Sequence, residues 1–353
     1  MEPIEKVFTP SLQLIFISRY DQNYSRSAVL LHSLALRKFS HFIRINNVFK
    51  DVWKTATYAR RQVGPKTVFV VMSPSSYLTP ILKLMTSRPI ILDSGWPLLD
   101  GFNSRIENKK KIISRIKTYI IDFTAFTCAS LILLESSVQK ENVHRRFFVS
   151  RKKITVTPTG FDESRATAPL TEFRPQPKYI LFRGKINSEA GIQNIVRTFS
   201  EFLPGLELWI VTDKWTVNLI LPPNVKLKIG HFSDDELSFF YRNAQLSIGQ
   251  ISSNNRLDRT VPHKAFESSF FGVPYISLRT RAMLEYFPDE DSGVKYIEKA
   301  DSEVLANAIL EIAESKELRE AMSRQISNRY SCLLSQKIIS ENFRELLIRK
   351  NYA

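Results

Sequence analysis

Short apolar stretches alternate with longer amphipathic stretches along nearly the whole sequence. In the first half, runs rich in valine, isoleucine and leucine predict strands at residues 12–18, 41–46, 67–73, 89–94, 131–136 and 154–159. Apolar residues that recur every three or four positions predict helices between these strands, near residues 26–38, 50–62, 106–127 and 137–147. Nearly continuous apolar strands separated by helices are typical of a parallel sheet that helices cover on both faces.

The second half of the sequence follows the same plan. Its apolar runs predict strands at residues 178–184, 206–212, 225–230, 245–251 and 273–278. The helical pattern recurs near residues 190–203, 234–243, 261–271 and 301–314. Two such series predict an α/β protein with two doubly wound, Rossmann-like domains, each built on a parallel sheet. Ligands of such sheets bind beyond the carboxyl ends of the strands, so we expect the site in a cleft that both domains face.

The composition of the middle of the chain marks the domain boundary. Residues 162–177, DESRATAPLTEFRPQP, contain three prolines and no periodic apolar pattern, as a linker does. We therefore expect a first domain, a linker, a second domain and a C-terminal helix, at residues 1–165, 166–177, 178–332 and 333–353. The C-terminal helix is amphipathic and has no strand after it, and we expect it to pack back toward the first domain.

The bulk properties favour a soluble protein of a reducing compartment. Hydrophobic residues make up 43% of the 353 positions, and no stretch reaches the roughly 20 uninterrupted apolar residues of a membrane span. The N-terminus lacks a basic region followed by an apolar run, so we expect no signal peptide. Cys128 and Cys332 lie far apart without metal-type spacing, which argues against a disulfide framework and a zinc site. We expect a cytoplasmic protein, and the inner face of the membrane is the alternative location.

The net charge is the unusual bulk property. The chain has 50 lysines and arginines but 35 aspartates and glutamates, so its formal net charge is +15. Such a surface attracts polyanions. Basic residues alternate with isoleucines over residues 105–117, and others cluster over 145–153. A basic helix with an apolar stripe can lie on an anionic membrane, and a soluble helix with a hydrated outer face is the alternative. We expect no nucleic-acid partner, because no recognisable binding module occurs.

The most informative single stretch is RTVPHKAFESSFFGVPYI, residues 259–276. Pro262 suits the first turn of a helix, and Gly272 suits the residue after its end. Lys264 and Glu267 are three residues apart and so share one side of that helix, with His263 one turn before Glu267.

Basic residues crowd the start of the same helix, namely Arg256, Arg259, His263 and Lys264. Cations at a helix N-terminus are unfavourable by roughly 0.3–1 kcal/mol each, whereas anions bind there. The pattern predicts a phosphate-bearing ligand at this terminus, and a solvated charged face is the alternative.

A polar loop, FRGKINSEAGI at residues 182–192, follows the first strand of the second domain. Arg183 and Lys185 supply positive charge, and Gly184 lets the backbone approach a ligand closely. The loop matches neither a P-loop nor a G-x-G-x-x-G fingerprint.

These motifs resemble those of glycosyltransferase family 4, whose members have the GT-B fold. The matching passages, which occur in the family's order over most of residues 12–315, are ASLILLESSVQKENV (129–143), KKITVTPTGFD (152–162), FRGKINSEAGI (182–192), DDELSFFYRNAQLSIG (234–249) and PHKAFESSFFGVPYI (262–276). The resemblance implies a retaining, hexosyltransferase-type enzyme. Such an enzyme moves a sugar from an NDP-sugar to a lipid-linked, polysaccharide or other glycan acceptor, and needs neither a bound metal nor a cofactor.

The resemblance also assigns roles in the second domain. Glu267 matches the carboxylate that grips the nucleotide's ribose hydroxyls, and Lys185 stands where the family has an arginine for the diphosphate. The sequence departs from the family at Ala190, where the family has a lysine, and at Arg259, where it has an acid that contacts the donor sugar. The missing charge can come from Arg183, Arg259 and Lys264. Glu285 matches an acidic residue that follows the family's donor-binding loop.

Three residues of the first domain are candidates as well. Ser25 and Arg26 follow the first strand, where the family has a phosphate-facing loop; the alternative for Ser25 is a helix cap. Asp93 ends a strand and can orient an acceptor hydroxyl or the donor sugar, and the alternative is a structural turn.

Two other functions fit the same fold. The departures at Ala190 and Arg259 suit a non-catalytic GT-B relative that binds nucleotide-sugars. A GT-B sugar-nucleotide epimerase would share the nucleotide site, but it typically needs several carboxylates and a histidine in the cleft. The single carboxylate of residues 259–276 argues against the epimerase.

Overall fold

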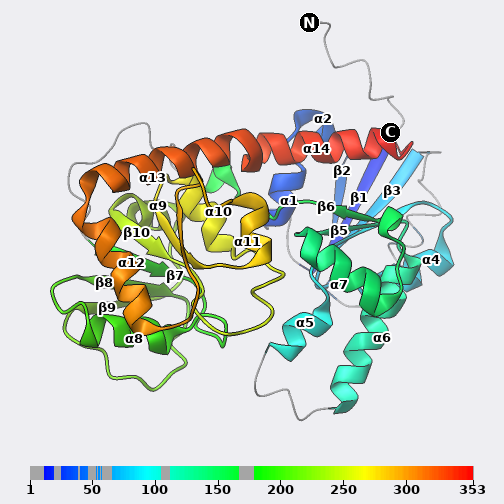
Figure 1. Cartoon of the computed structure of the whole chain (residues 1–353). Helices are drawn as coiled ribbons and strands as arrows, with labels where there is room; N and C mark the ends of the chain where they lie inside the picture. Colours follow the sequence, from blue (N-terminus) through cyan, green and yellow to red (C-terminus); the bar gives the residue numbers. More distant parts are fainter. Residues whose placement is uncertain are drawn as a thin grey trace, which may run out of the picture. The chain divides into compact units, whose positions relative to one another are not determined.

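The computed structural model describes residues 12–19, 25–38, 40–46, 53, 55, 57, 66–104, 112–166 and 179–352 (Figure 1). The chain divides into two compact units. The first unit comprises residues 1–160 and 336–353, and the second comprises residues 161–335. Of the predicted linker, residues 166–177, only Ala166 lies within the described residues.

The first unit is built on a parallel sheet of six strands in the order β2-β1-β3-β4-β5-β6. The strands are β1 (Leu12–Ser18), β2 (Ser40–Arg44), β3 (Lys66–Met72), β4 (Ile90–Gly95), β5 (Leu131–Leu134) and β6 (Ile154–Val156). Successive residues of a strand face opposite sides of the sheet. Ile15 and Ile17 accordingly join one buried apolar cluster, whereas Leu14 and Phe16 join another, so both faces are covered.

The helices of the first unit differ from the sequence prediction in detail. They are α1 (Ser25–Leu30), α2 (Leu34–Lys38), α4 (Leu78–Met85), α5 (Leu98–Asn103), α6 (Ile112–Cys128), α7 (Ser137–Phe147) and α14 (Gln336–Arg349). The single helix predicted at 26–38 is two short helices, and α4 and α5 were not predicted. The short α5 depends on a distant residue, because Asp122 of α6 accepts hydrogen bonds from the backbone N–H groups of Leu98 and Leu99. The helix predicted at 50–62 lies largely outside the described residues.

The last helix, α14, completes the core of the first unit. Its Ile339, Phe343 and Leu347 are buried among side chains of β1, β3 and α1. Ser340 Oγ accepts a hydrogen bond of 2.8 Å from the backbone N–H of Ser33, so polar groups also fix the helix along α1 (Figure 1).

The second unit is built on another parallel six-stranded sheet, in the order β12-β11-β10-β7-β8-β9. Its strands are β7 (Tyr179–Arg183), β8 (Leu208–Thr212), β9 (Val225–Ile229), β10 (Ala244–Ile248), β11 (Tyr275–Leu278) and β12 (Val294–Ile297). The predicted fold class, with two doubly wound parallel sheets, is confirmed. The edge strand β12 was not predicted, because it has only four residues and follows a polar stretch.

Helices cover both faces of the second sheet. They are α8 (Ile192–Glu201), α9 (Asp234–Arg242), α10 (His263–Phe270), α11 (Arg281–Tyr286), α12 (Ser302–Glu314) and α13 (Lys316–Arg329). In β7, Ile180 and Phe182 pack with α8 and α12, whereas Tyr179 and Leu181 pack with α10 and its neighbours. The short α11 and the polar α13 were not predicted as helices.

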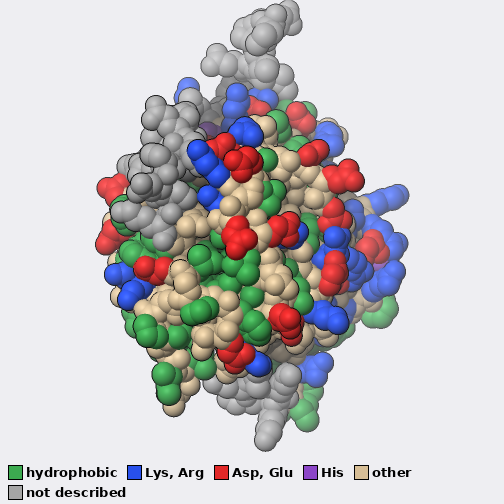
Figure 2. Space-filling view, turned by 60° about the vertical axis from the view of Figure 1, so that its left-hand side comes forward, with side chains coloured by type: hydrophobic (Ala, Val, Ile, Leu, Met, Phe, Trp, Pro, Cys, Tyr) green, Lys and Arg blue, Asp and Glu red, His purple; other side chains and the backbone are tan. Residues whose placement is uncertain are grey.

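The charged side chains are mixed on the surface. On the face shown in Figure 2, acidic and basic side chains are interspersed, with apolar groups between them. The excess of positive charge therefore does not form one uniform patch on that face. None of the described helices is both long enough and apolar enough to cross a bilayer.

We predict that Phe343→Ala destabilises the first unit by about 3–5 kcal/mol, because it removes a fully buried aromatic side chain from the α14 contact. Hydrogen exchange of the β1 amides under increasing urea measures this loss. Glu345→Ala is the matched control, since Glu345 is an exposed residue of the same helix. Equal protection of β1 in the two variants would contradict a stabilising role for α14.

Candidate functional site

Three segments of the second unit meet where strands β7 and β10 end. The two strands are neighbours in the sheet, and the chain leaves β7 at Arg183 and β10 at Ile248. The loop after β10 leads into α10, which begins at His263. Residues that are about 80 positions apart in sequence therefore come together at one edge of the sheet, where open α/β sheets bind their ligands.

The first turn of α10 has no side-chain cap. Pro262 precedes the helix with an extended ψ of 132° and offers no side-chain acceptor to cap it. Gly272 follows the helix with a φ of +65°, a left-handed conformation that favours glycine. Gly272 thus follows the end of the helix, as predicted. Pro262 was predicted in the first turn, but it lies just before that turn. The uncapped N-terminus carries the positive end of the helix dipole.

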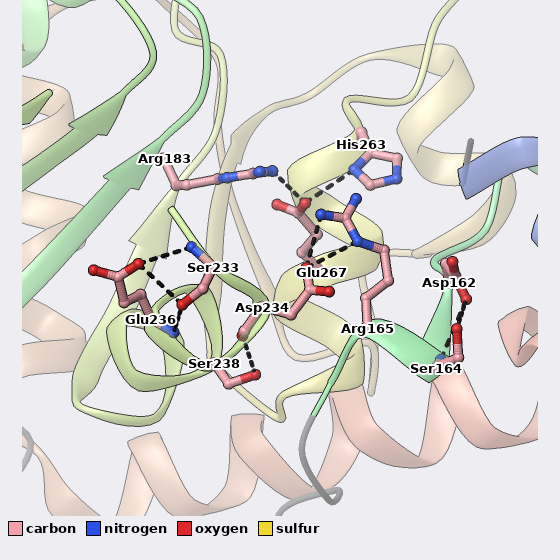
Figure 3. Close-up of polar contacts among 10 residues, drawn as sticks. All are labelled: Asp162, Ser164, Arg165, Arg183, Ser233, Asp234, Glu236, Ser238, His263 and Glu267. Atoms are coloured by element: carbon pink, nitrogen blue, oxygen red, sulfur yellow. Dashed lines mark hydrogen bonds and ion pairs between the residues drawn. The ribbon is translucent and has the colours of Figure 1, made fainter. Parts of the chain in front are cut away.

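The centre of the site is the buried carboxylate of Glu267. Arg183 Nη1 donates to Glu267 Oε1, and His263 Nδ1 lies 3.1 Å from the same oxygen (Figure 3). The hydroxyl of the fully buried Tyr241 donates to Oε2 at 2.6 Å. Burial by itself would raise the pKa of Glu267, but the charges of Arg183 and His263 and these hydrogen bonds hold that pKa well below its ordinary value. Glu267 is therefore an anion at neutral pH.

Lys264 is a buried cation of this site. Its side chain is buried, and Nζ lies 3.7 Å from the centre of the Phe182 ring, in a cation–π contact. Among the described residues, no carboxylate forms an ion pair with Lys264, and the nearby Glu267 pairs with Arg183 and His263 instead. Burial lowers the pKa of Lys264 to about 7, and the charge of Glu267 opposes that shift only in part. A buried, uncompensated lysine of this kind favours the approach of an anion.

The loop after β7 is shaped around Lys264. Gly184 has a φ of +141°, and a methyl group added there would lie 3.2 Å from Lys264 Nζ. Lys185 is exposed at the tip of this loop. Ala190 is fully buried and belongs to the apolar cluster under α8, so this position cannot present a lysine to a ligand without repacking.

The other predicted residues of the second unit have structural partners. Arg256 Nη1 forms a buried ion pair with Glu189, at 2.7 Å from each carboxylate oxygen. Arg259 lies in the turn before α10 and is half-buried. Asp258 accepts from the backbone N–H and the guanidinium of Arg281, and so holds the start of α11. Glu285 is half-buried on α11.

The predicted residues of the first unit also come together. Arg26, in the first turn of α1, forms a buried ion pair with Asp93 of β4, at 2.9 Å between Nη2 and Oδ1. Arg26 Nε also donates to Asp93 Oδ2 at 2.9 Å, and Arg26 Nη1 donates to the Pro158 carbonyl. The two charges neutralise each other at the carboxyl end of the sheet. Ser25 begins α1, but its side chain lies outside the described part of the structure.

The sequence analysis did not select three residues that complete these sites. Tyr241 lies in α9, within the predicted helix, but its contact with Glu267 depends on the fold. Phe182 is a β7 core residue whose contact with Lys264 depends on the fold. In the first unit, Glu135 is buried directly after β5 and accepts a hydrogen bond of 3.2 Å from Thr159 Oγ1. A glutamate at the end of the apolar run LILLES was the available signal.

Most of the second unit also matches a known protein family. Residues 168–329 match the family described as glycosyl transferases group 1. The second unit is thus similar to the group 1 glycosyl transferases over almost its whole length. No curated protein resembles the chain closely enough in sequence to count as a relative.

Several solved structures with a similar fold cover nearly all of this GT-B chain. HepE of Anabaena, determined in complex with UDP-glucose, has a TM-score of 0.71 at 12% identity, over 95% of this chain and 99% of HepE. Sucrose-phosphate synthase of Thermosynechococcus elongatus has a TM-score of 0.74 at 13% identity, over 96% and 98%. A Listeria monocytogenes protein described as a putative UDP-N-acetylglucosamine 2-epimerase has a TM-score of 0.57 at 11% identity, over 97% of each chain. At such identities the likeness shows the fold, which transferases and an epimerase-like protein share.

We predict that Tyr241→Phe destabilises the second unit by about 1.5–3 kcal/mol, because the lost hydrogen bond ends on the charged Glu267. The control is Tyr179→Phe, which removes a buried hydrogen bond of 3.0 Å to the neutral carbonyl of Phe240 and should cost about 0.5–1.5 kcal/mol. Urea unfolding of both variants gives the two losses. A smaller loss for Tyr241→Phe than for Tyr179→Phe would mean that Glu267 is not held as an anion.

Proposed function

We propose that this GT-B protein is a glycosyltransferase of the family 4 type, which transfers a hexosyl group from an NDP-sugar to a glycan or lipid-linked acceptor. The observation that carries the proposal is the buried Lys264 beside the uncapped first turn of α10, for which no ion pair with a carboxylate occurs in the described part of the chain. Both features favour a diphosphate. The match of residues 168–329 to glycosyl transferases group 1 and the UDP-glucose in HepE support the choice of an NDP-sugar as the donor.

Each residue of the site has a task in this proposal. Lys264, the α10 N-terminus and the exposed Lys185 bind the two phosphates, and Arg183 adds positive charge beside them. A carboxylate oxygen can accept two hydrogen bonds. Oε1 of Glu267 has its two donors, whereas Oε2 receives the Tyr241 hydroxyl and can accept a ribose hydroxyl as well.

The chemistry that this site can supply is electrostatic. Negative charge grows on the diphosphate as its bond to the anomeric carbon breaks, and fixed cations and helix dipoles stabilise that charge. The sugar passes through an oxocarbenium-like state. We propose retention of the anomeric configuration, with the departing phosphate accepting the proton of the acceptor hydroxyl, and a reaction without a bound metal. Within the described part of the chain, no group of three or more His, Cys, Asp and Glu side chains is placed to hold a metal ion.

The cytoplasm is the proposed compartment. Cys128 and Cys332 are free thiols, and Cys332 is exposed, which suits a reducing environment.

A non-catalytic nucleotide-sugar-binding protein is the second candidate. Arg259 stands where the resemblance places an acid for the donor sugar, and the neighbouring Asp258 is bound to Arg281. Incubation with UDP-, GDP- and ADP-sugars separates the candidates. Binding with slow donor hydrolysis or transfer supports the transferase, binding without turnover supports the second candidate, and an altered sugar would indicate an epimerase.

We predict that Lys264→Gln weakens binding of the preferred NDP-sugar about 10- to 100-fold, because an ionic hydrogen bond contributes about 1.5–3 kcal/mol. Isothermal titration calorimetry measures the affinity. Lys299→Gln, which changes an exposed lysine of the same unit, should bind as the native protein does. Native affinity in Lys264→Gln would remove Lys264 from the site.

We also predict that NDP-sugar affinity falls as the pH rises from 6 to 8.5. At a pH below the Lys264 pKa of about 7, the lysine is already charged before the ligand binds. At a higher pH the neutral amine must take up a proton when the ligand binds, which lowers the affinity by up to about tenfold per pH unit. The phosphates of an NDP-sugar do not titrate in this interval. Lys264→Arg should bind without this pH dependence, and His263→Gln should keep it. A slope that persists in Lys264→Arg would assign the proton to another group.

A further inference from the structure

The outward side of α6 in the first unit is apolar. Its residues Ile112, Ile113, Ile116, Ile120 and Phe123 are all exposed, from 39% at Phe123 to 84% at Ile113. A surface helix normally turns its apolar stripe to the core and its polar side to water. Exposed apolar groups that gather on one element, unlike scattered ones, indicate an interaction surface.

The spacing of these residues places them on one face. Residues 112, 116, 120 and 123 follow the i, i+4, i+8, i+11 pattern of a single helical stripe, and Ile113 borders it. The opposite side of α6 packs against its own unit, because Ala125 and Phe126 are buried in the core and Asp122 caps α5. Figure 1 shows the N-terminal end of α6 extending beyond the strands of its unit. The exposed stripe, with Arg115 and Lys117, is called the α6 outer face below.

The charges of the α6 outer face have one sign. Arg115 and Lys117 are exposed, and Asp122, the one acidic residue of α6, is buried. At the other end of the helix, Lys153 Nζ donates to the carbonyl of Thr127 at 3.0 Å, so a further ammonium group lies at the C-terminal end of α6. An apolar stripe that is flanked by lysine and arginine is complementary to a surface whose outer layer carries negative charges and whose inner layer consists of apolar acyl chains.

We infer that the α6 outer face binds the surface of an anionic lipid bilayer, with the isoleucines and Phe123 at the boundary of headgroups and acyl chains and with Arg115 and Lys117 on the lipid phosphates. A second copy of the chain is a poorer partner, because it would bring two positive faces together. A nucleic acid would leave the isoleucines unburied, since they offer no platform for stacked bases.

The inference extends the proposed function without depending on it. Binding to vesicles can be measured without any sugar transfer. Failure of the membrane inference therefore does not contradict the proposed function, and failure of the proposed function does not contradict the membrane inference. If both hold, the acceptor hydroxyl belongs to a lipid-borne molecule at the same membrane surface. An enzyme and an acceptor that are both confined to one membrane surface meet more often than they would in solution. That consequence alone rests on the proposed function.

Vesicle flotation of the full-length protein tests the inference. The probes are vesicles of phosphatidylcholine alone and vesicles with phosphatidylglycerol added. We expect binding to the anionic vesicles and little to the neutral ones, with weaker binding at high salt because salt screens exposed charges. The double variant Ile113→Glu/Ile116→Glu should bind at least about tenfold more weakly, since it places charge at the centre of the apolar face.

The matched control is Ile220→Glu, which changes an isoleucine of the second unit that is 96% exposed. It should float as the native protein does. Because all three positions are exposed, the variants should keep the native circular dichroism and melting temperature. Equal flotation of the double variant and the control would overturn the inference. So would a native dimer in light scattering that Ile113→Glu/Ile116→Glu converts to a monomer, because the face would then bind a second copy.

Discussion

The buried carboxylate of Glu267 is the interaction on which the site of the second unit depends. Removing a carboxylate from water is costly unless donors replace the lost water, and here Arg183, Tyr241 and His263 do so from three different elements. The ion pair therefore joins β7, α9 and α10 at one edge of the sheet. The contact also has an electrostatic consequence, because the positive charge of Arg183 offsets the charge of Glu267, so that Glu267 compensates Lys264 only in part. The charge of Lys264 then remains for a ligand, and a diphosphate is the ligand whose chemistry fits.

At the corresponding edge of the sheet in the first unit, the buried charges cancel. Arg26 and Asp93 are both buried and neutralise each other through three hydrogen bonds, and Arg26 also contacts the Pro158 carbonyl. This pair suits the orientation of a polar, uncharged group better than the binding of a phosphate. The contrast between the two sheet edges supports the proposal that the charged donor binds to the second unit, which is also the part that matches the group 1 glycosyl transferases. In the first unit, the exposed apolar residues of α6 are the basis of the inferred contact with an anionic bilayer.

The sequence was sufficient for the parallel sheets, because their strands are short, nearly continuous apolar runs. It missed β12, α4, α5, α11 and α13, which are short or polar and owe their stability to neighbours such as Asp122 under α5. Within α10, helical spacing was enough to place His263 and Glu267 on one side. The contacts of Tyr241, Phe182 and Glu189 could not be predicted, because they depend on which strands pair and on how the loops after β7 and β10 approach each other.

The most direct measurement is a crystal structure of the protein with its preferred NDP-sugar. The account predicts that the diphosphate lies against the first turn of α10 within ion-pair distance of Lys264 Nζ, while Glu267 keeps Arg183 and receives a ribose hydroxyl. A donor bound elsewhere, with Lys264 still over the Phe182 ring and without a phosphate contact, would contradict the account.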